Sequence, residues 1–176
     1  PVAFAPDGVG IAGTRPCVAG TQWQWDGVRF RFLHPPRYFP YLDNESSCVL
    51  RIETVHGRVA LLTGDIDAVV ERDLVRRDRS ALRADVVLVA HHGSRTSSDA
   101  AFIAATGARQ ALVSAGYGNR FHHPNPATVQ RWQTAGASIS DTLDAGALRV
   151  RLQAGGVTLE AWRRSHPHLW DAVQRQ

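Results

Sequence analysis

A continuous apolar run that stops at a cluster of polar residues is the sequence feature that most constrains the fold. Residues 85–90 read DVVLVA, are rich in valine, and are followed at once by His91, His92, Gly93 and Ser94. Such a run is typical of a strand covered on both faces, because a strand with one solvated face alternates apolar and polar residues. We therefore expect an inner strand of a layered sheet, with polar side chains presented where that strand ends.

The segments around this strand predict a mixed α/β fold. Alternating residues on both sides of Asp26-Gly27 and of His56-Gly57 predict two β-hairpins. Amphipathic patterns predict helices over 67–82, from 98 or 99 to about 105 and over 126–135, with a buried strand over 110–115 and a hairpin-like tail over 137–162. We expect residues 1–22 to be irregular, residues 23–162 to form the domain, and residues 163–176 to form a basic tail.

The composition is that of one globular domain of 176 residues, and no apolar run approaches the roughly 18 residues that cross a bilayer. The 20 basic residues are all arginine and outnumber the 16 acidic ones, which gives a net charge of +4. This mild basicity attracts phosphate-rich partners, but it is also common in domains that bind none. Because the chain begins with Pro1 and contains no methionine, we expect it to be a piece of a longer protein.

The two cysteines, Cys17 and Cys48, have no metal-binding spacing. A single disulfide fits a domain outside the cytoplasm. Two buried thiols are the interpretation that the sequence favours.

Candidate metal ligands follow two of the expected strands. The strand over 58–63 ends in Gly64-Asp65, and the strand over 85–90 ends in His91-His92. If the two strands are neighbours, a carboxylate and two imidazoles meet at one sheet edge, a combination that suits Zn²⁺ or Mn²⁺. The alternative is that Asp65 only caps the next helix and that one histidine is a packed core residue.

Candidate phosphate ligands follow the same histidines. Gly93 permits a close backbone approach, and the hydroxyl and guanidinium donors that follow lie beside an expected helix start, an arrangement suited to phosphate. These donors are Ser94, Arg95, Thr96 and Ser97.

A third polar loop follows the buried strand over 110–115. In it His123 can act as a metal ligand or as an acid or base, while Asn119 and Arg120 can hold an oxyanion or phosphate. The alternative is a turn whose histidines only pack under the prolines. Asn44, Ser46 and Ser47 are weaker candidates at the same edge.

Four segments together resemble the C-terminal metallo-β-lactamase-like domain of the ComEC family of bacterial competence proteins. They read LLTGDID, ADVVLVAHHGSRTSS, GYGNRFHHPNPATVQRW and DTLDAGALRV, and the upstream TQWQWDGVRFRFLHPP and NESSCVLRIET fit the same domain. The resemblance covers about residues 17 to 152. It implies an α/β fold of the metallo-β-lactamase type, here the C-terminal half of an αββα sandwich. It also implies a two-metal nuclease that degrades the non-transported strand of incoming DNA, in a soluble domain attached to a membrane-embedded channel region of an inner-membrane protein.

The resemblance also implies roles for individual residues. Asp65 would bridge two ions, Mn or Zn, in the intact domain, and His91 and His92 would lie at the metal centre, although which of them ligates stays open. Asp65 and His123 would be the catalytic residues, with His123 near the metal or the substrate. His122 stands where the family has glycine and takes no role. Ser94, Thr96 and Ser97 would face phosphate.

The sequence departs from the family pattern in its first half. The family's Asp-Val-Gly-Gln-Gly strand and its His-x-Asp-x-Asp-His motif, which supplies most metal ligands, are both missing. We therefore expect weak or no metal binding, no nuclease activity from this chain by itself, and an exposed sheet edge that favours self-association. The competing interpretations are a non-catalytic DNA-binding or assembly domain of the uptake channel, and another metallo-β-lactamase-like hydrolase that acts on a small ester.

Overall fold

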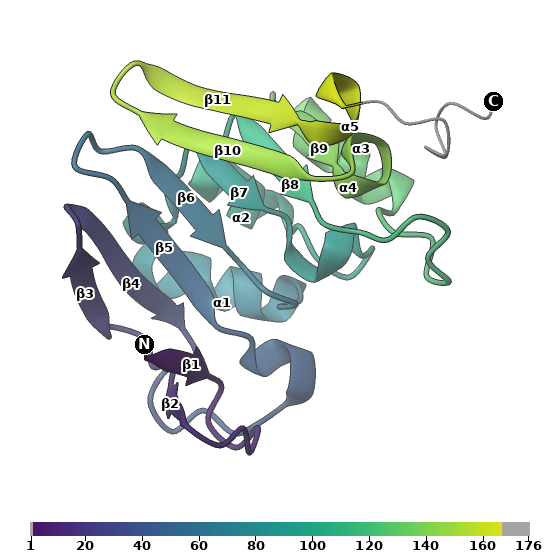
Figure 1. Cartoon of the computed structure of the whole chain (residues 1–176). Helices are drawn as coiled ribbons and strands as arrows, with labels where there is room; N and C mark the ends of the chain where they lie inside the picture. Colours follow the sequence, from purple (N-terminus) through teal and green to yellow (C-terminus); the bar gives the residue numbers. More distant parts are fainter. Residues whose placement is uncertain (1, 167–176) are drawn as a thin grey trace.

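A computed structural model describes residues 2–166 and contains a seven-stranded mixed sheet (Figure 1). Its strands lie side by side in chain order: β3 (Gln22–Trp25), β4 (Val28–His34), β5 (Val49–Glu53), β6 (Val59–Leu62), β7 (Val86–Leu88), β8 (Gln110–Val113) and β9 (Ser138–Asp141). Neighbours from β3 to β6 are antiparallel, and neighbours from β6 to β9 are parallel. The mixed α/β class expected from the sequence is confirmed.

Both predicted hairpins are present. Asp26 and Gly27 adopt the left-handed region, with φ of 50° and 76°, as a type I′ turn between β3 and β4 requires. The second hairpin joins β5 to β6 across Gly57, whose φ is 72°. In both cases the short-range turn signal determines the strand pairing.

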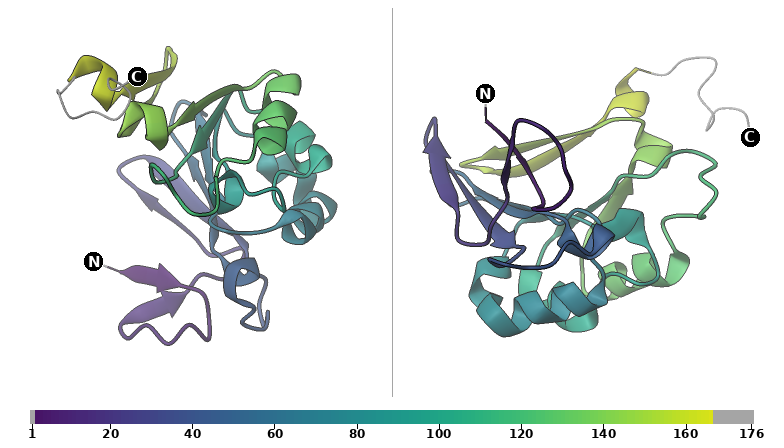
Figure 2. Two further views of the ribbon diagram at one scale, coloured as in Figure 1. Left: turned by 90° about the vertical axis from the view of Figure 1, so that its right-hand side faces the viewer. Right: turned by 90° about the horizontal axis from the view of Figure 1, so that it is seen from below.

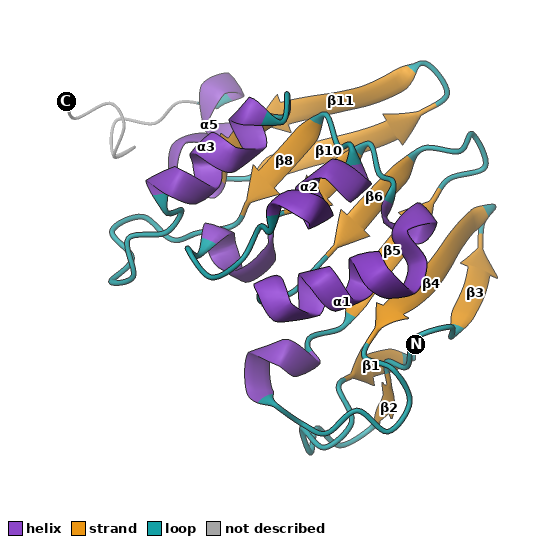
Figure 3. Cartoon of the chain, turned by 180° about the vertical axis from the view of Figure 1, so that it is seen from behind, coloured by secondary structure: helices purple, strands orange, loops and turns teal. Residues whose placement is uncertain are grey.

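The three longer helices cover one face of the sheet (Figure 3). They are α1 (Ala68–Asp78), α2 (Ala100–Thr106) and α3 (Pro126–Thr134), and each begins at a side-chain cap, from Asp67, Asp99 and Asn125 respectively. The predicted helix over 67–82 ends earlier than expected and continues as the 3₁₀ turn η2 (Arg79–Leu82). The main core lies between this face and the helices and includes Leu61, Val87, Phe102 and Trp132.

The opposite face of the sheet carries none of the three longer helices and faces the viewer in Figure 1. The hairpin of β10 (Leu148–Gln153) and β11 (Gly156–Ala161) and the N-terminal segment lie on that side (Figure 2), and Phe4 of this segment packs on Phe32 with ring centroids 5.1 Å apart. Strand register aligns one apolar residue from each of five neighbouring strands across this face: Phe32, Leu50, Leu62, Leu88 and Leu112. Leu62, in the middle of this row, is 36% exposed. We call these five residues the apolar row.

The first 22 residues differ from the irregular segment that the sequence predicts. They contain β1 (Ala3–Ala5) and β2 (Thr14–Pro16), which pair in parallel. Phe4 of β1 stacks on Trp23 with ring centroids 5.1 Å apart, so this segment packs against the aromatic residues of the edge strand. The many glycines and prolines concealed these short strands, because they break any periodic pattern.

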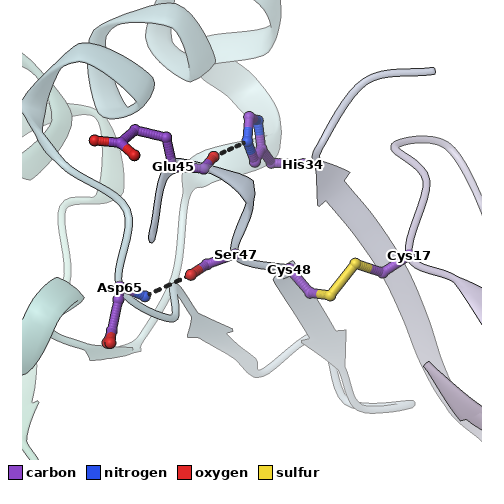
Figure 4. The surroundings of a disulfide bond; sticks show 6 residues. All are labelled: Cys17, His34, Glu45, Ser47, Cys48 and Asp65. Atoms are coloured by element: carbon purple, nitrogen blue, oxygen red, sulfur yellow. Dashed lines mark hydrogen bonds between the residues drawn. A yellow bond between two sulfur atoms is a disulfide. The ribbon is translucent and has the colours of Figure 1, made fainter. Parts of the chain in front are cut away.

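The cysteines form a disulfide, which corrects the prediction of two buried thiols. Cys17 follows β2 and Cys48 precedes β5, and their Cα atoms are 5.9 Å apart (Figure 4). The chain after Cys17 runs past the end of β4, where Gly20 N–H donates to the Phe32 carbonyl, so the two cysteines meet beside that strand. Sequence spacing gives no sign of this contact.

The C-terminal part is described as far as residue 166. After β9 the chain forms the short α4 (Thr142–Ala145), and after β11 the short α5 (Trp162–Ser165). Most of the predicted basic tail, residues 167–176, lies outside the described residues. Among the described helices, none combines the length and the apolar character that a bilayer crossing requires.

Candidate functional site

The predicted site residues gather at one edge of the sheet. Because β6, β7 and β8 are parallel neighbours, the segments that follow them leave at the same edge. Asp65 follows β6, His91 and His92 follow β7, and His123 lies in the long loop after β8. The start of the antiparallel β5 lies at this edge too, which brings in the 3₁₀ turn η1 (Asp43–Ser46) that precedes it.

The backbone that carries the two adjacent histidines has an unusual conformation. His91, His92 and Gly93 are consecutive left-handed residues, with φ of 51°, 54° and 76°. A non-glycine residue in a sparsely populated backbone region costs about 1 to 3 kcal/mol, and such residues gather at functional sites. The strand therefore turns sharply at its end and holds both imidazoles at the sheet edge.

Gly93 is required for packing, and the ligand approach expected from the sequence stays a prediction. A Cβ atom at this position would lie 2.7 Å from Cβ of Pro124, and the Gly93 carbonyl accepts a hydrogen bond from Asn125 N–H. The histidine turn and the loop after β8 are thus in direct contact. This contact brings His123 toward the other histidines.

The side chains of Asp65 and His92 face each other through two atoms that can both only accept a hydrogen bond. His92 Nδ1 lies 2.6 Å from the Ser114 carbonyl oxygen, which can only accept, so Nδ1 carries the hydrogen. In a neutral ring Nε2 therefore carries a lone pair, and this atom lies 3.6 Å from Oδ1 of Asp65. Such a pair is stabilised by a cation between the two groups or by a proton on His92.

His91 and His123 add nitrogen atoms that have no hydrogen-bond partner. Nδ1 of each ring is buried and unpartnered, and the two ring centroids are 6.0 Å apart. Burial lowers the pKa of His123, and the neighbouring His91 and His92 lower it further. Unpaired imidazole nitrogens are the donors that transition metals accept.

The donor set suits a metal ion in kind but not in number. Asp65, His91, His92 and His123 supply carboxylate oxygen and imidazole nitrogen, the ligand types of Zn²⁺ and Mn²⁺ sites. Within residues 2–166, however, no three histidine, cysteine, aspartate or glutamate side chains are arranged to hold an ion. The described residues therefore offer part of a metal site.

Much of the predicted phosphate-binding run is used inside the fold. Ser97 is buried and donates its hydroxyl to the Ala90 carbonyl at 2.9 Å. Ser94 is also buried, and its hydroxyl lies 3.1 Å from that of Thr96. Arg95 and Thr96 are the two predicted donors of this run that are exposed to solvent.

Carboxylates already occupy the backbone N–H groups at the start of α2. The buried Glu71 side chain of α1 accepts hydrogen bonds from the N–H groups of Ser98 at 2.8 Å and Asp99 at 2.6 Å. Asp99 in turn accepts from Ala101 N–H. The geometry thus assigns this helix start to structural anchoring of the histidine loop.

Asn119 builds the loop after β8. Its side-chain amide donates to the carbonyls of Gly116 and His123, and its oxygen accepts from His123 N–H, all within 2.8 to 2.9 Å. Arg120 remains exposed, with its guanidinium carbon 4.7 Å from the ring centroid of Phe121. Asn119 and Arg120 are the two predicted anion ligands in this loop. The Asn119 side chain is used within the loop, whereas the exposed Arg120 side chain can reach an anion.

Sequence reasoning underrated the contribution of the turn before β5. Asn44 Nδ2 lies 3.4 Å from Nε2 of His91. The Ser47 hydroxyl accepts a hydrogen bond from Asp65 N–H at 3.0 Å, which Figure 4 shows. Buried His34 donates to the Glu45 carbonyl at 2.7 Å and holds this turn in place (Figure 4). The run of Asn, Glu and Ser before a strand was the available signal, but such runs usually mark simple turns.

Comparison with known proteins finds relatives whose names refer to bacterial competence and recombination. Over 151 residues, 86% of the chain, it is 40% identical to competence protein ComA of Neisseria gonorrhoeae. The chain is homologous to a segment of competence proteins. It is also 33% identical to ComE operon protein 3 of Bacillus subtilis over 75% of the chain, and 31% identical to recombination protein 2 of Haemophilus influenzae over 76%.

These matches cover 22%, 17% and 16% of the respective relatives, so the chain spans about a fifth of their length. No family model matches the chain.

Proposed function

We propose that the chain is the C-terminal metallo-β-lactamase-like domain of a ComEC-type DNA-uptake protein. In the intact parent it supplies one side of a hydrolytic centre that degrades the non-transported DNA strand. The observation that carries this proposal is the convergence of Asp65, His91, His92 and His123 at one sheet edge, with facing acceptors on Asp65 and His92.

The part of this sheet face that stays exposed supports a second layer in the parent protein. Phe32 and Leu112 of the apolar row are already buried, and another sheet would cover the exposed Leu62 and its half-buried neighbours Leu50 and Leu88, as the inner faces of two packed sheets bury each other in a sandwich. In an αββα arrangement this second sheet would bring further ligands to the same edge. The edge strands β3 and β9 offer unpaired backbone groups for self-association as an alternative contact.

Different residues of the chain would bind the metal ions and the DNA phosphates at this centre. Asp65, His92 and the unpartnered nitrogens of His91 and His123 would supply part of the ligands of two divalent ions, Mn or Zn, and the rest of the parent would supply the others. When bound, such ions polarise a phosphate oxygen and lower the pKa of water. Arg95, Thr96 and Arg120 are exposed and would hold the phosphate backbone. The membrane-embedded channel region of the parent, in the inner membrane, would deliver the strand.

The test is a linear DNA degradation assay with the full-length parent in Mn²⁺ or Zn²⁺. We expect the double change His91→Ala and His92→Ala to abolish degradation. The matched control is His56→Ala, at the exposed turn of the β5–β6 hairpin, which should leave degradation unchanged. Unchanged degradation by the double variant would show that the site assignment is wrong.

Metal content distinguishes this proposal from its competitors. We expect the chain by itself to hold less than one ion and to leave linear DNA intact, and the parent to hold stoichiometric metal. Stoichiometric metal and cleavage by the chain alone would contradict the need for a second side. A parent that binds DNA without metal or cleavage would favour a non-catalytic DNA-binding or assembly domain, and cleavage of a small ester instead of DNA would favour the third interpretation.

A further inference from the structure

A pocket lies beside the histidines, between the end of β8 and the loop that follows it. Its volume is about 280 Å³, and its walls include Ala115, Gly116, Phe121, His92 and His123. This volume lies at the lower end for small-molecule sites, so the pocket suits one small group rather than an extended ligand. Alanine, glycine and aromatic walls favour a flat and largely apolar group.

An exposed aromatic ring forms one wall of this pocket. Phe121 is 62% exposed, and its ring is nearly parallel to that of His123, at 18° with centroids 5.7 Å apart. Tyr117, on the same loop, is 70% exposed. Aromatic side chains placed in solvent next to a polar site offer π-faces for stacking, which is how proteins hold unpaired bases.

The backbone of the loop that carries this ring is held in place. Three hydrogen bonds of Asn119 close the turn from Gly116 to His123, and the contact of Pro124 with Gly93 fixes the loop to the end of β7. A backbone that is already ordered loses little conformational entropy on binding. The loop therefore presents Phe121 to solvent from an ordered backbone.

The charge around the pocket suits a nucleotide strand. The Arg120 guanidinium lies over one face of the Phe121 ring, 4.7 Å from its centroid, and Arg95 on the neighbouring loop is exposed. An arginine next to a stacking ring can bind the phosphate that adjoins a stacked base. Bases inside a duplex have no free face, so this geometry selects an unpaired strand.

We propose that this pocket binds one unpaired nucleobase of a DNA strand, stacked on Phe121, and that the Arg120 guanidinium moves from the face of this ring to the adjoining phosphate. The proposal deepens the proposed function and rests on it, because it places a phosphodiester next to His92 and His123. Phe121 is then a positioning residue that sets which phosphodiester meets the histidines. Single-stranded DNA is thereby the preferred substrate class.

The test compares two labelled strands of equal length by fluorescence anisotropy with the purified chain. One is an oligothymidylate of 15 nucleotides, and the other is the same deoxyribose-phosphate backbone without bases. We expect the oligothymidylate to bind about 5- to 150-fold more tightly, the range that corresponds to stacking of one base. A duplex of the same length should bind no better than the abasic strand.

Three variants show whether Phe121 is the cause. Phe121→Leu keeps an apolar side chain without a π-face and should reduce oligothymidylate binding to the abasic level, while abasic binding stays unchanged. Phe121→Trp should restore tight binding. Trp25→Leu is the matched control, because Trp25 is 74% exposed at the opposite edge of the sheet and should have no effect.

The outcomes separate the two proposals. Equal and measurable binding of the two strands would overturn the base pocket and leave DNA binding intact. No binding of either strand would also overturn the base pocket, whereas the proposed function fails separately, if the His91→Ala, His92→Ala parent still degrades linear DNA. Thymidine monophosphate, added at the same nucleotide concentration, should not displace the oligothymidylate. Full displacement would show that the pocket binds a free nucleotide and not a base within a strand.

Discussion

At the residue scale, the three left-handed residues after β7 shape the candidate site. The sequence indicates a strand that ends in polar residues, and this is correct, but nothing in the letters indicates that two histidines adopt positive φ. Only Gly93 signals such a conformation in advance, because glycine adopts it without a steric cost. Its partner Pro124 is 31 positions away, and a contact at that separation cannot be predicted from local pattern.

This backbone conformation makes a prediction at His91. His91→Gly should be more stable than His91→Ala by about 1 kcal/mol, because a Cβ atom is disfavoured in the left-handed region. At Ala104, an exposed position in α2, the order should reverse, and Ala104→Gly should cost about 1 kcal/mol. Urea denaturation gives all the free energies of unfolding. If the alanine variant at position 91 is as stable as the glycine variant, the strain at this turn is refuted.

At the scale of elements, Glu71 connects α1 to the start of α2. The sequence pattern predicts an amphipathic helix over 67–82 and does not single out this residue. Glu71 lies three positions before the buried Leu74, on the same face of the helix, and it is fully buried. The spacing therefore places Glu71 on the buried face of the helix. A buried carboxylate is nevertheless too rare to predict before its two N–H partners are known.

Burial raises the pKa of Glu71 from 4.5 to about 7, although the two backbone N–H groups oppose this shift. The folded state keeps the proton to higher pH than the unfolded state, so stability falls between pH 4.5 and 7. Glu71→Gln imitates the protonated form. Between pH 5 and 8, the free energy of unfolding of the wild type should therefore fall by up to about 3 kcal/mol relative to that of this variant. Urea denaturation at both pH values measures the difference, and a constant difference would contradict the assignment.

At the scale of the whole molecule, the chain order of the elements was predictable and the long-range contacts were not. Hairpins, capped helices and buried strands follow from turn residues and periodicity within a few positions. The strands β1 and β2 and the disulfide depend on residues that meet only after folding. For the same reason the apolar row could not be assembled from the sequence before the register was known.

The disulfide makes a prediction for global stability. Because it closes a loop of 31 residues, replacing both cysteines by serine should cost about 3 to 4 kcal/mol in the free energy of unfolding. Reduction of the wild type with dithiothreitol should cause a similar loss and should leave the double variant unchanged. A wild type that melts at the same temperature with and without reductant would show that the bond adds no stability.

The strand order described above also bears on how the sheet is made during synthesis. From β3 to β9, each strand lies next to its predecessor in the chain. As the polypeptide leaves the ribosome, every new strand of this sheet finds its partner already translated, and none has to wait for a later one to fill a gap. Such an order keeps contacting residues close in sequence, which favours fast folding. The sheet can thus grow in one direction, at the pace of translation.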